Sequence, residues 1–231
     1  MRTWSLLLIF DLDGTLIDSS ADLAISMNVA REHVGLPPLD PSLIFSYVGN
    51  GAAALVRRAL GPGASESTVQ SALDFFLKFY RAHALEHTKL YPGIGETLKA
   101  LAEEDHTLAV LTNKPVRIST DIIKALHVGE LFFRIYGGDS FPQKKPDPIG
   151  ITTLQREACI GADDTLMVGD SGVDVQTARN AGVRSCGATW GFQPEAFEKD
   201  APEYLVHSAQ ELLTTIRGQQ TAIRDASNQY S

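Results

Sequence analysis

The chain has 231 residues, of which 44% are apolar and 21% charged, and its 28 acidic side chains outnumber the 20 basic ones to give a net charge of −8. This composition predicts a globular protein of one large or two unequal domains, and the acidic charge disfavours nucleic acid and membrane surfaces as partners, because phosphate groups are bound by basic side chains. The two cysteines exclude a disulfide framework or a four-thiolate zinc site within the chain, and no apolar run suits a signal peptide or a membrane span, so we expect a cytoplasmic protein.

Short apolar runs, each followed by a polar turn, predict buried strands along the chain. They cover residues 4–10, 106–111, 131–136, 165–168, 183–188 and 204–206. Between them lie helical stretches over residues 94–104, 116–126, 149–159, 173–181 and 209–216. The alternation of strands and helices predicts an α/β fold with a doubly wound, Rossmann-like parallel sheet.

A helical insertion separates the first strand from the second. Asp13 and Thr112 lie 99 positions apart, although a helical connection between parallel strands needs only ~30 residues. Within the insertion, apolar residues such as Val69, Phe76 and Tyr80 recur at helical spacing. We therefore predict a core domain of residues 1–16 and 90–217, an inserted all-helical domain of residues 17–89, and a polar tail of residues 218–231 that frays.

Two acidic residues follow the first predicted strand. Because residues two apart in an extended chain point the same way, Asp11 and Asp13 are expected to enter one pocket at the carboxyl edge of the sheet, where α/β folds bind ligands. Gly14 allows the chain to turn away directly afterwards. Two carboxylates this close repel each other unless a proton or a metal ion is shared between them.

Polar residues also follow the later strands. Thr112 and Asn113 precede a helix N-terminus, which favours phosphate oxygens, and Lys145 precedes a proline that holds it outside helical geometry. Asp170 and Asp174 lie at a further strand end. Each of these groups alone is also found in ordinary turns and helix caps. Gathered at one edge of the sheet, however, their charges destabilise the fold unless a cation and an anion bind there. The sequence therefore predicts a functional site that takes both.

These residues resemble the four motifs of the haloacid dehalogenase superfamily, and the resemblance covers nearly the whole chain. The motifs are Asp11-Leu12-Asp13-Gly14-Thr15, Thr112-Asn113, Lys145-Pro146-Asp147-Pro148 and Gly169-Asp170-Ser171 with Asp174. The inserted helices resemble the C1 cap of that superfamily. Residues 47–51, 91–93, 112–115 and 137–139 are similar to segments of bacterial phosphoglycolate phosphatases.

The resemblance implies a phosphatase that uses Mg²⁺ as its cofactor. Asp11 is then the nucleophile that forms an aspartyl-phosphate, and Asp13 is the acid and base for the leaving group and the hydrolytic water. Thr112 and Asn113 bind phosphoryl oxygens, and Lys145 offsets their negative charge. The implied metal ligands are the carboxylates of Asp11 and Asp170 and the backbone carbonyl of Asp13, with Asp174 as an anchor behind them.

Substrate choice is expected to come from the cap and from residues near Asn113, because the core motifs supply only what any phosphate ester needs. The candidates are the turn formed by Gly49, Asn50 and Gly51 and the cations Arg57, Arg58, Lys114 and Arg117. Cations at this place suit a second anionic group, so we predict hydrolysis of 2-phosphoglycolate to glycolate and phosphate. The expected partner is thus a small phosphate ester, and the protein is expected to be a monomer or a homodimer.

Other readings stay open at this point: hydrolysis of a sugar phosphate, a nucleoside monophosphate or pyrophosphate, phosphosugar mutation, or a non-enzymatic phospho-acceptor module. Two local patterns match known motifs but are interpreted as non-functional matches. Residues 49–54 match a dinucleotide-binding pattern but follow no core strand, and residues 83–87 match a zinc-protease pattern but are expected to form a solvated helix end.

Overall fold

The computed structural model describes residues 5–228, and a parallel sheet of six strands forms its centre. In spatial order the strands are β5 (Phe132–Tyr136), β4 (Thr107–Leu111), β1 (Leu7–Phe10), β6 (Thr165–Gly169), β7 (Arg184–Ala188) and β8 (Tyr204–Val206). Every neighbouring pair runs parallel. The predicted strands are confirmed to within one residue, except the first, which begins at Leu7 and leaves Ser5 and Leu6 outside it; its expected start at Trp4 lies outside the described residues.

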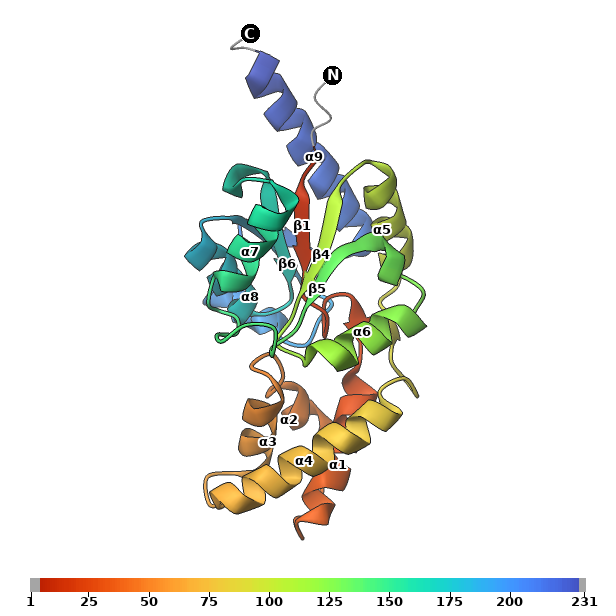
Figure 1. Cartoon of the computed structure of the whole chain (residues 1–231), viewed down its shortest axis with the longest axis vertical. Helices are drawn as coiled ribbons and strands as arrows, with labels where there is room; N and C mark the ends of the chain where they lie inside the picture. Colours follow the sequence, from red (N-terminus) through yellow and green to blue (C-terminus); the bar gives the residue numbers. More distant parts are fainter. Residues whose placement is uncertain (1–4, 229–231) are drawn as a thin grey trace.

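Helices cover both faces of the sheet (Figure 1), as a doubly wound fold requires. They are α5 (Ile94–Glu103), α6 (Val116–Ala125), α7 (Ile149–Ala158), α8 (Gly172–Ala181) and α9 (Ala209–Asn228). Successive residues of β1 alternate between the two cores: Leu8 packs with residues of α5, α6 and α9, whereas Ile9 packs with residues of α7 and α8. The central strand is therefore buried on both sides, and its carboxyl end is the only part free to present polar groups.

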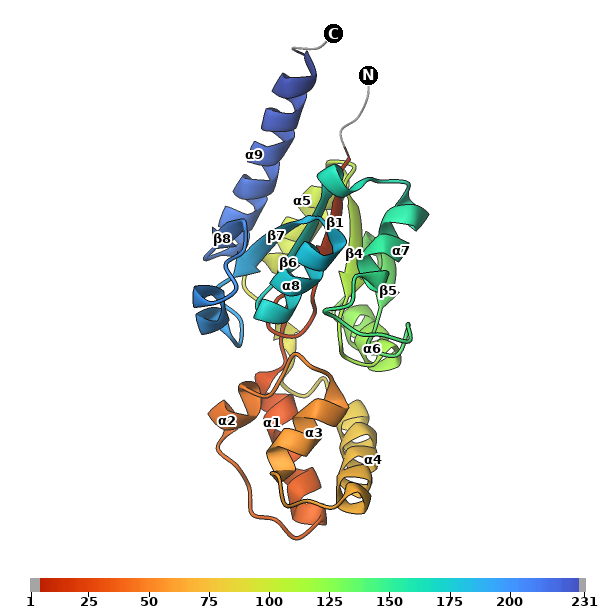
Figure 2. The ribbon, with the colours of Figure 1, turned by 90° about the vertical axis from the view of Figure 1, so that its left-hand side faces the viewer.

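Four helices gather beyond the carboxyl edge of the sheet (Figures 1 and 2). They are α1 (Ser20–His33), α2 (Pro41–Phe45), α3 (Ala52–Leu60) and α4 (Glu66–His83). The two chain segments that join them to the sheet pair with each other as the short antiparallel strands β2 (Ile17–Asp18) and β3 (Lys89–Leu90). Both connections therefore lie side by side, next to the strand ends.

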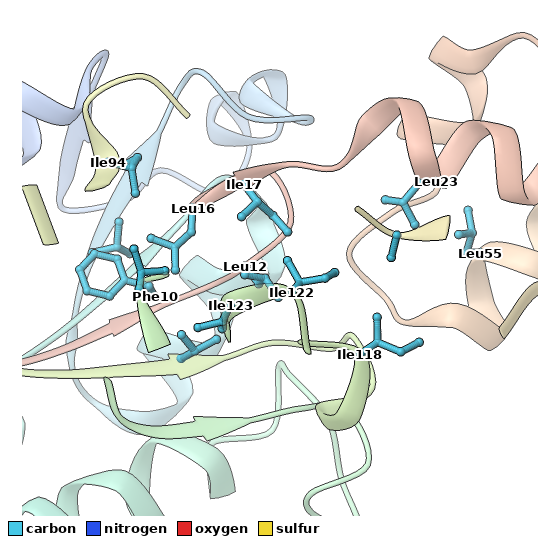
Figure 3. Packing of buried hydrophobic residues seen from close by; sticks show 14 of the residues in the cluster. Phe10, Leu12, Leu16, Ile17, Leu23, Leu55, Ile94, Ile118, Ile122 and Ile123 are labelled. Atoms are coloured by element: carbon cyan, nitrogen blue, oxygen red, sulfur yellow. The ribbon is translucent and has the colours of Figure 1, made fainter. Parts of the chain in front are cut away.

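Apolar packing continues from the sheet into these helices. Figure 3 shows Leu12 of the sheet region beside Ile122 of α6, and Ile118 of the same helix lying toward Leu23 of α1 and Leu55 of α3. In α4 the predicted stripe is buried, including Phe76 and Tyr80, at 2% exposure each. The helical insertion thus shares one apolar cluster with one face of the sheet.

Helix α9 begins beside the sheet and projects past its amino-terminal edge (Figure 2). Its first turns are anchored by the buried residues Leu212, Leu213 and Ile216, and helix propagation from this anchor continues to Asn228. The expected fraying is therefore wrong for residues 218–228, while residues 229–231 lie outside the described part. Within residues 5–228, no helix has the length and apolar composition that crossing a bilayer requires.

Candidate active site

The residues that follow β1 form the floor of the site. Asp11 is buried, and its Oδ1 accepts hydrogen bonds from the backbone N–H of Leu12 at 2.7 Å and from Lys145 Nζ at 2.9 Å. No described residue donates a hydrogen bond to its Oδ2. At Gly14 the backbone has φ +82°, and an added Cβ would lie 2.1 Å from Asp170 Oδ2. Only glycine therefore lets the first motif pass this close to the acid on β6.

A buried network ties Lys145 to the acids. Lys145 Nζ donates to Asp174 Oδ1 at 2.6 Å as well as to Asp11. Asp174 Oδ2 accepts from the backbone N–H and the hydroxyl of Ser171, in a capping box that starts α8. Burial opposes the charge on Lys145, but its two carboxylate partners outweigh it and raise the pKa of the ammonium. Asp174 therefore uses both oxygens to hold Lys145 and the helix start.

Asp170 completes a cluster of buried acids. It accepts hydrogen bonds from the hydroxyl of Thr15 at 3.1 Å and the backbone N–H of Phe192 at 2.8 Å. Asp11, Asp170 and Asp174 each offer an oxygen within 4.8 Å of the others. Burial is the main cause that raises the pKa of Asp11 to about 6 and the pKa of Asp170 well above its ordinary value.

These carboxylates fit a hard divalent cation. Lys145 supplies a single positive charge for the three buried acids, so negative charge remains uncompensated in a site of oxygen donors. Oxygen donors of this kind are what Mg²⁺ prefers. Among the described residues no other group of histidines, cysteines and acids is close enough to hold a metal. His83 and His87 of the zinc-protease pattern instead bond to separate acids, Glu86 and Asp22.

Thr112 and Asn113 follow β4, as predicted, and reach the same edge. Both are buried, and the Thr112 side chain accepts a hydrogen bond from the backbone N–H of Lys114 at 3.3 Å. The Asn113 amide donates to the backbone oxygens of Gly49 at 2.8 Å and Lys145 at 3.0 Å. Its buried Oδ1 has no hydrogen-bond partner in the described part of the chain. Asn113 thus links the inserted helices to the loop that carries Lys145.

A cavity lies between the sheet edge and the inserted helices. The cavity has a volume of about 50 Å³, several times the roughly 10–15 Å³ that one water molecule needs. Its walls combine the acids and Thr112 with apolar cap side chains: the lining includes Asp11, Asp13, Asp170, Thr112, Asn113, Gly49, Gly51, Leu55, Phe76 and Tyr80. The arrangement accommodates a small ligand whose charged end meets the strand edge.

The predicted cap cations do not reach this cavity. Neither Arg57 nor Arg58 lines it, and both are exposed on α3. Arg57 instead forms a two-pronged ion pair with Glu66, at 2.6 and 2.7 Å. The reason is helical phase: the buried side of α3 carries Leu55, Val56, Ala59 and Leu60, which turns both arginines outward. Asn50 and the exposed Arg117 do not line the cavity either.

Lys114 and Tyr80 occupy the position expected for the arginines. Lys114 Nζ lies 2.9 and 3.0 Å from the two carboxylate oxygens of Asp13 and 2.6 Å from the Tyr80 hydroxyl. Burial opposes its charge, but Asp13 and Tyr80 outweigh this effect and raise the pKa of Lys114. Burial also raises the pKa of Tyr80 to about 12. Tyr80 belongs to the apolar stripe of α4, which is why the sequence indicated packing alone.

The loop after β7 supplies contacts that no sequence pattern indicated. The Gln193 amide donates to the backbone oxygen of Val48 at 2.7 Å, and the Trp190 indole N–H donates to the backbone oxygen of Thr15 at 3.0 Å. Phe192 and Gln193 line the cavity. This loop therefore joins the first strand end, the acid on β6 and the inserted helices.

Comparisons with known proteins agree with this geometry. Residues 8–188 match the family model for haloacid dehalogenase-like hydrolases. The phosphoglycolate phosphatase of Vibrio vulnificus strain YJ016 is 40% identical over 219 residues, which cover 91% of this chain and 95% of the relative. Phosphoglycolate phosphatase 1 of Pseudomonas aeruginosa is 38% identical, and the match covers 90% of this chain and 78% of that relative. A crystal structure described as a predicted phosphoglycolate phosphatase from Haemophilus somnus superposes with a TM-score of 0.88 at 32% identity, covering 93% of this chain and 99% of that one. This chain is therefore a member of the haloacid dehalogenase-like hydrolases.

Proposed function

We propose that this hydrolase is a Mg²⁺-dependent phosphomonoesterase that converts 2-phosphoglycolate to glycolate and phosphate through an aspartyl-phosphate. The observation that carries the proposal is the Asp11 carboxylate at the cavity: Leu12 and Lys145 hold one oxygen, and no described residue donates a hydrogen bond to the other. Relatives named phosphoglycolate phosphatase at about 40% identity support the substrate. Two cysteines without a disulfide are in keeping with a cytoplasmic location.

The first chemical step joins Asp11 to phosphorus. The free Asp11 oxygen attacks, the bond from phosphorus to the bridging ester oxygen breaks, and Asp13 gives its proton to that departing oxygen. Water then attacks the aspartyl-phosphate, its proton passes to Asp13, and the bond between phosphorus and Asp11 breaks. Lys145, held by Asp174, offsets the negative charge at Asp11 throughout. The Thr112 hydroxyl and the backbone N–H of Asn113 are proposed to bind the phosphoryl oxygens, since both side-chain N–H groups of Asn113 already donate to Gly49 and Lys145.

The proposed ligands of Mg²⁺ are Asp11, Asp170 and the backbone carbonyl of Asp13, with Asp174 acting from behind through Lys145 and Ser171. The bound ion supplies positive charge that stabilises the phosphoryl oxygens during transfer. The residues of this chain orient the nucleophile, the acid and the ester around it.

We expect Mg²⁺ to stabilise the protein more at about pH 8 than at about pH 5. The pKa of Asp11 is raised to about 6, so the metal-free folded state binds a proton more tightly than the unfolded chain and loses stability as the pH rises from about 4 to 6. A cation must displace that proton, so Mg²⁺ affinity grows over the same range. At ~100 times its dissociation constant the ion adds about 2.7 kcal/mol, which thermal unfolding detects as a higher Tm.

The Asp170→Asn variant should lose this stabilisation, whereas Asp163→Asn, which alters an exposed acid away from the cluster, should keep it. Equal increases in Tm at both pH values would contradict the assignment of Asp11 as a ligand. EDTA should remove phosphatase activity from the wild type, and Mg²⁺ should restore it.

We further propose that residues 17–89 act as a cap that opens and closes on the core formed by residues 1–16 and 90–217. The hinges are residues 17–20 and 89–93, because both connections pair there as β2 and β3. Three polar contacts join the cap to the core at the cavity: Asn113 to Gly49, Gln193 to Val48 and Lys114 to Tyr80. Closure with these contacts excludes water from the reacting groups.

The Gln193→Ala variant should lower kcat/KM by roughly 2- to 10-fold, because it removes one neutral hydrogen bond from the closed cap. Tm should change little, since the loop stays attached through Trp190 and Phe192. Gln210→Ala on α9 is the matched control and should behave as the wild type. An unchanged kcat/KM in Gln193→Ala would show that this contact does not assist closure.

The test of the substrate is a panel assayed with Mg²⁺: 2-phosphoglycolate, ethyl phosphate, sugar phosphates, nucleoside monophosphates and pyrophosphate. The proposal expects the highest kcat/KM for 2-phosphoglycolate. A higher value for an uncharged sugar phosphate would overturn the substrate and leave the phosphatase chemistry standing. Isomerised sugar phosphate as the main product would indicate a mutase, and a single labelling event without turnover would indicate a phospho-acceptor module.

A further inference from the structure

Lys114 is the single cationic side chain that lines the cavity within the described residues. Its side chain is 4% exposed, and its ammonium lies against Asp13 and Tyr80. Lys145 stands behind the acids and is not part of the lining. Any anionic group of a ligand that extends from the phosphoryl position toward the cap therefore meets Lys114 and no other cation of the lining.

Apart from these contacts, the part of the cavity wall that comes from the inserted helices and α6 is largely apolar. Leu23, Leu55, Phe76 and Ile118 line the same cavity from the cap and from α6. A charged side chain buried among such groups is costly unless it serves a partner. Asp13 accounts for part of that need, but the Ser19 hydroxyl already donates to Asp13 Oδ1 at 2.6 Å. Asp13 thus already has a neutral hydrogen-bond donor in Ser19. A charged donor at the same place is more than the packing around Asp13 requires.

The ammonium can redirect one of its donors to a ligand. It carries three N–H groups, and contacts to Asp13 reach both oxygens of one carboxylate. One of these contacts can turn to a ligand oxygen while Asp13 remains paired. The Tyr80 hydroxyl accepts from Lys114 at 2.6 Å and donates to no described residue, so its own proton is also available. The pair therefore presents two donors at one point of the cavity wall.

We infer that Lys114, assisted by the Tyr80 hydroxyl, binds the carboxylate of the substrate and so determines specificity for a carboxylated leaving group, an assignment that rests on the proposed function. Asp13 faces the bridging oxygen in the proposed mechanism, and the carboxyl carbon of 2-phosphoglycolate is only two bonds from that oxygen. Because Lys114 contacts Asp13, the acid and the carboxylate-binding cation lie side by side, as a leaving group this short requires. Tyr80 lies on α4 of the cap, so the carboxylate site is complete only when the cap is closed.

The experiment compares kcat/KM for 2-phosphoglycolate and for ethyl phosphate, which lacks the carboxylate. Lys114→Met should lower the ratio of the two values by about 10- to 100-fold, the loss expected for a hydrogen bond to a charged group, with most of the change in KM for 2-phosphoglycolate. Lys124→Met removes an exposed cation from the same helix region and should leave the ratio unchanged. Tm values check that each variant folds.

Lys114→Gln provides a second variant that keeps a hydrogen-bonding side chain beside Asp13 and Tyr80 but lacks the charge, and it should lower the ratio in the same direction. If either folded Lys114 variant loses activity equally on both esters, Lys114 acts only through Asp13 and the inference is wrong. A wild type that hydrolyses both esters equally well overturns the proposed substrate itself. A wild-type preference that survives in both variants overturns only the role of Lys114.

Discussion

The Asp11→Asn variant is expected to lower kcat by more than about 10⁴-fold while the protein stays folded. An amide oxygen does not attack phosphorus, so the aspartyl-phosphate cannot form, and removal of a nucleophile from an interdependent site typically costs this much. The fold should persist because Lys145 keeps its 2.6 Å contact with Asp174. The measurements are kcat on 2-phosphoglycolate and on p-nitrophenyl phosphate, together with Tm.

Stability gives this experiment an internal check. The pKa of Asp11 is raised to about 6 mainly by burial, so the charged carboxylate is unfavourable in the metal-free fold near neutral pH. The neutral amide should therefore leave Tm in EDTA unchanged or higher. Activity above a small fraction of the wild-type value in a folded Asp11→Asn protein would contradict the covalent mechanism.

The Asp13→Asn variant is expected to lower kcat by about 10²- to 10⁴-fold on 2-phosphoglycolate, whose leaving oxygen needs a proton. The loss should be much smaller for release of p-nitrophenolate, which leaves without protonation. The variant removes the carboxylate that pairs with the buried Lys114 ammonium, so Tm should fall. The amide oxygen can still accept from Lys114 and Ser19, so the protein should remain folded. The readout is single-turnover release of each leaving group.

A matched control for this comparison is Asp163→Asn, which alters an exposed acid outside the cavity lining. It should affect both esters equally and weakly. Equal losses on both esters in Asp13→Asn would instead show that Asp13 holds the site together through Lys114 and does not transfer the proton.

Much of the fold could be predicted because its signals are local. A short apolar run bounded by polar residues, such as Leu7–Phe10, favours a buried strand, and the stripe through Phe76 and Tyr80 has the spacing of a helix. The end of α9 could not be predicted, because the polar residues after Ile216 carry no apolar pattern of their own. Their helical state comes from the packed turns that precede them.

The outward position of Arg57 and Arg58 could have been predicted from the sequence. Leu55, Val56, Ala59 and Leu60 form an apolar stripe, and the arginines lie on the opposite side of the same helix. Lys114 carried a weaker signal, namely its place directly after Asn113. The contacts of Gln193 and Phe192 carried none, since the loop that holds them matches no motif.

The sequence by itself determined the α/β class and the edge at which the acids, Thr112 and Lys145 assemble, because parallel strands joined by helices bring every carboxyl end to one side of the sheet. The assembly of these residues at one edge depends on the order of strands and helices along the chain, and it does not depend on the details of side-chain packing. The contact of Lys114 with Tyr80 inside the cavity was decided only by the tertiary structure. It depends on how α4 sits over the strand ends, and that orientation is set by the paired connections at β2 and β3 and by apolar contacts between residues far apart in the chain.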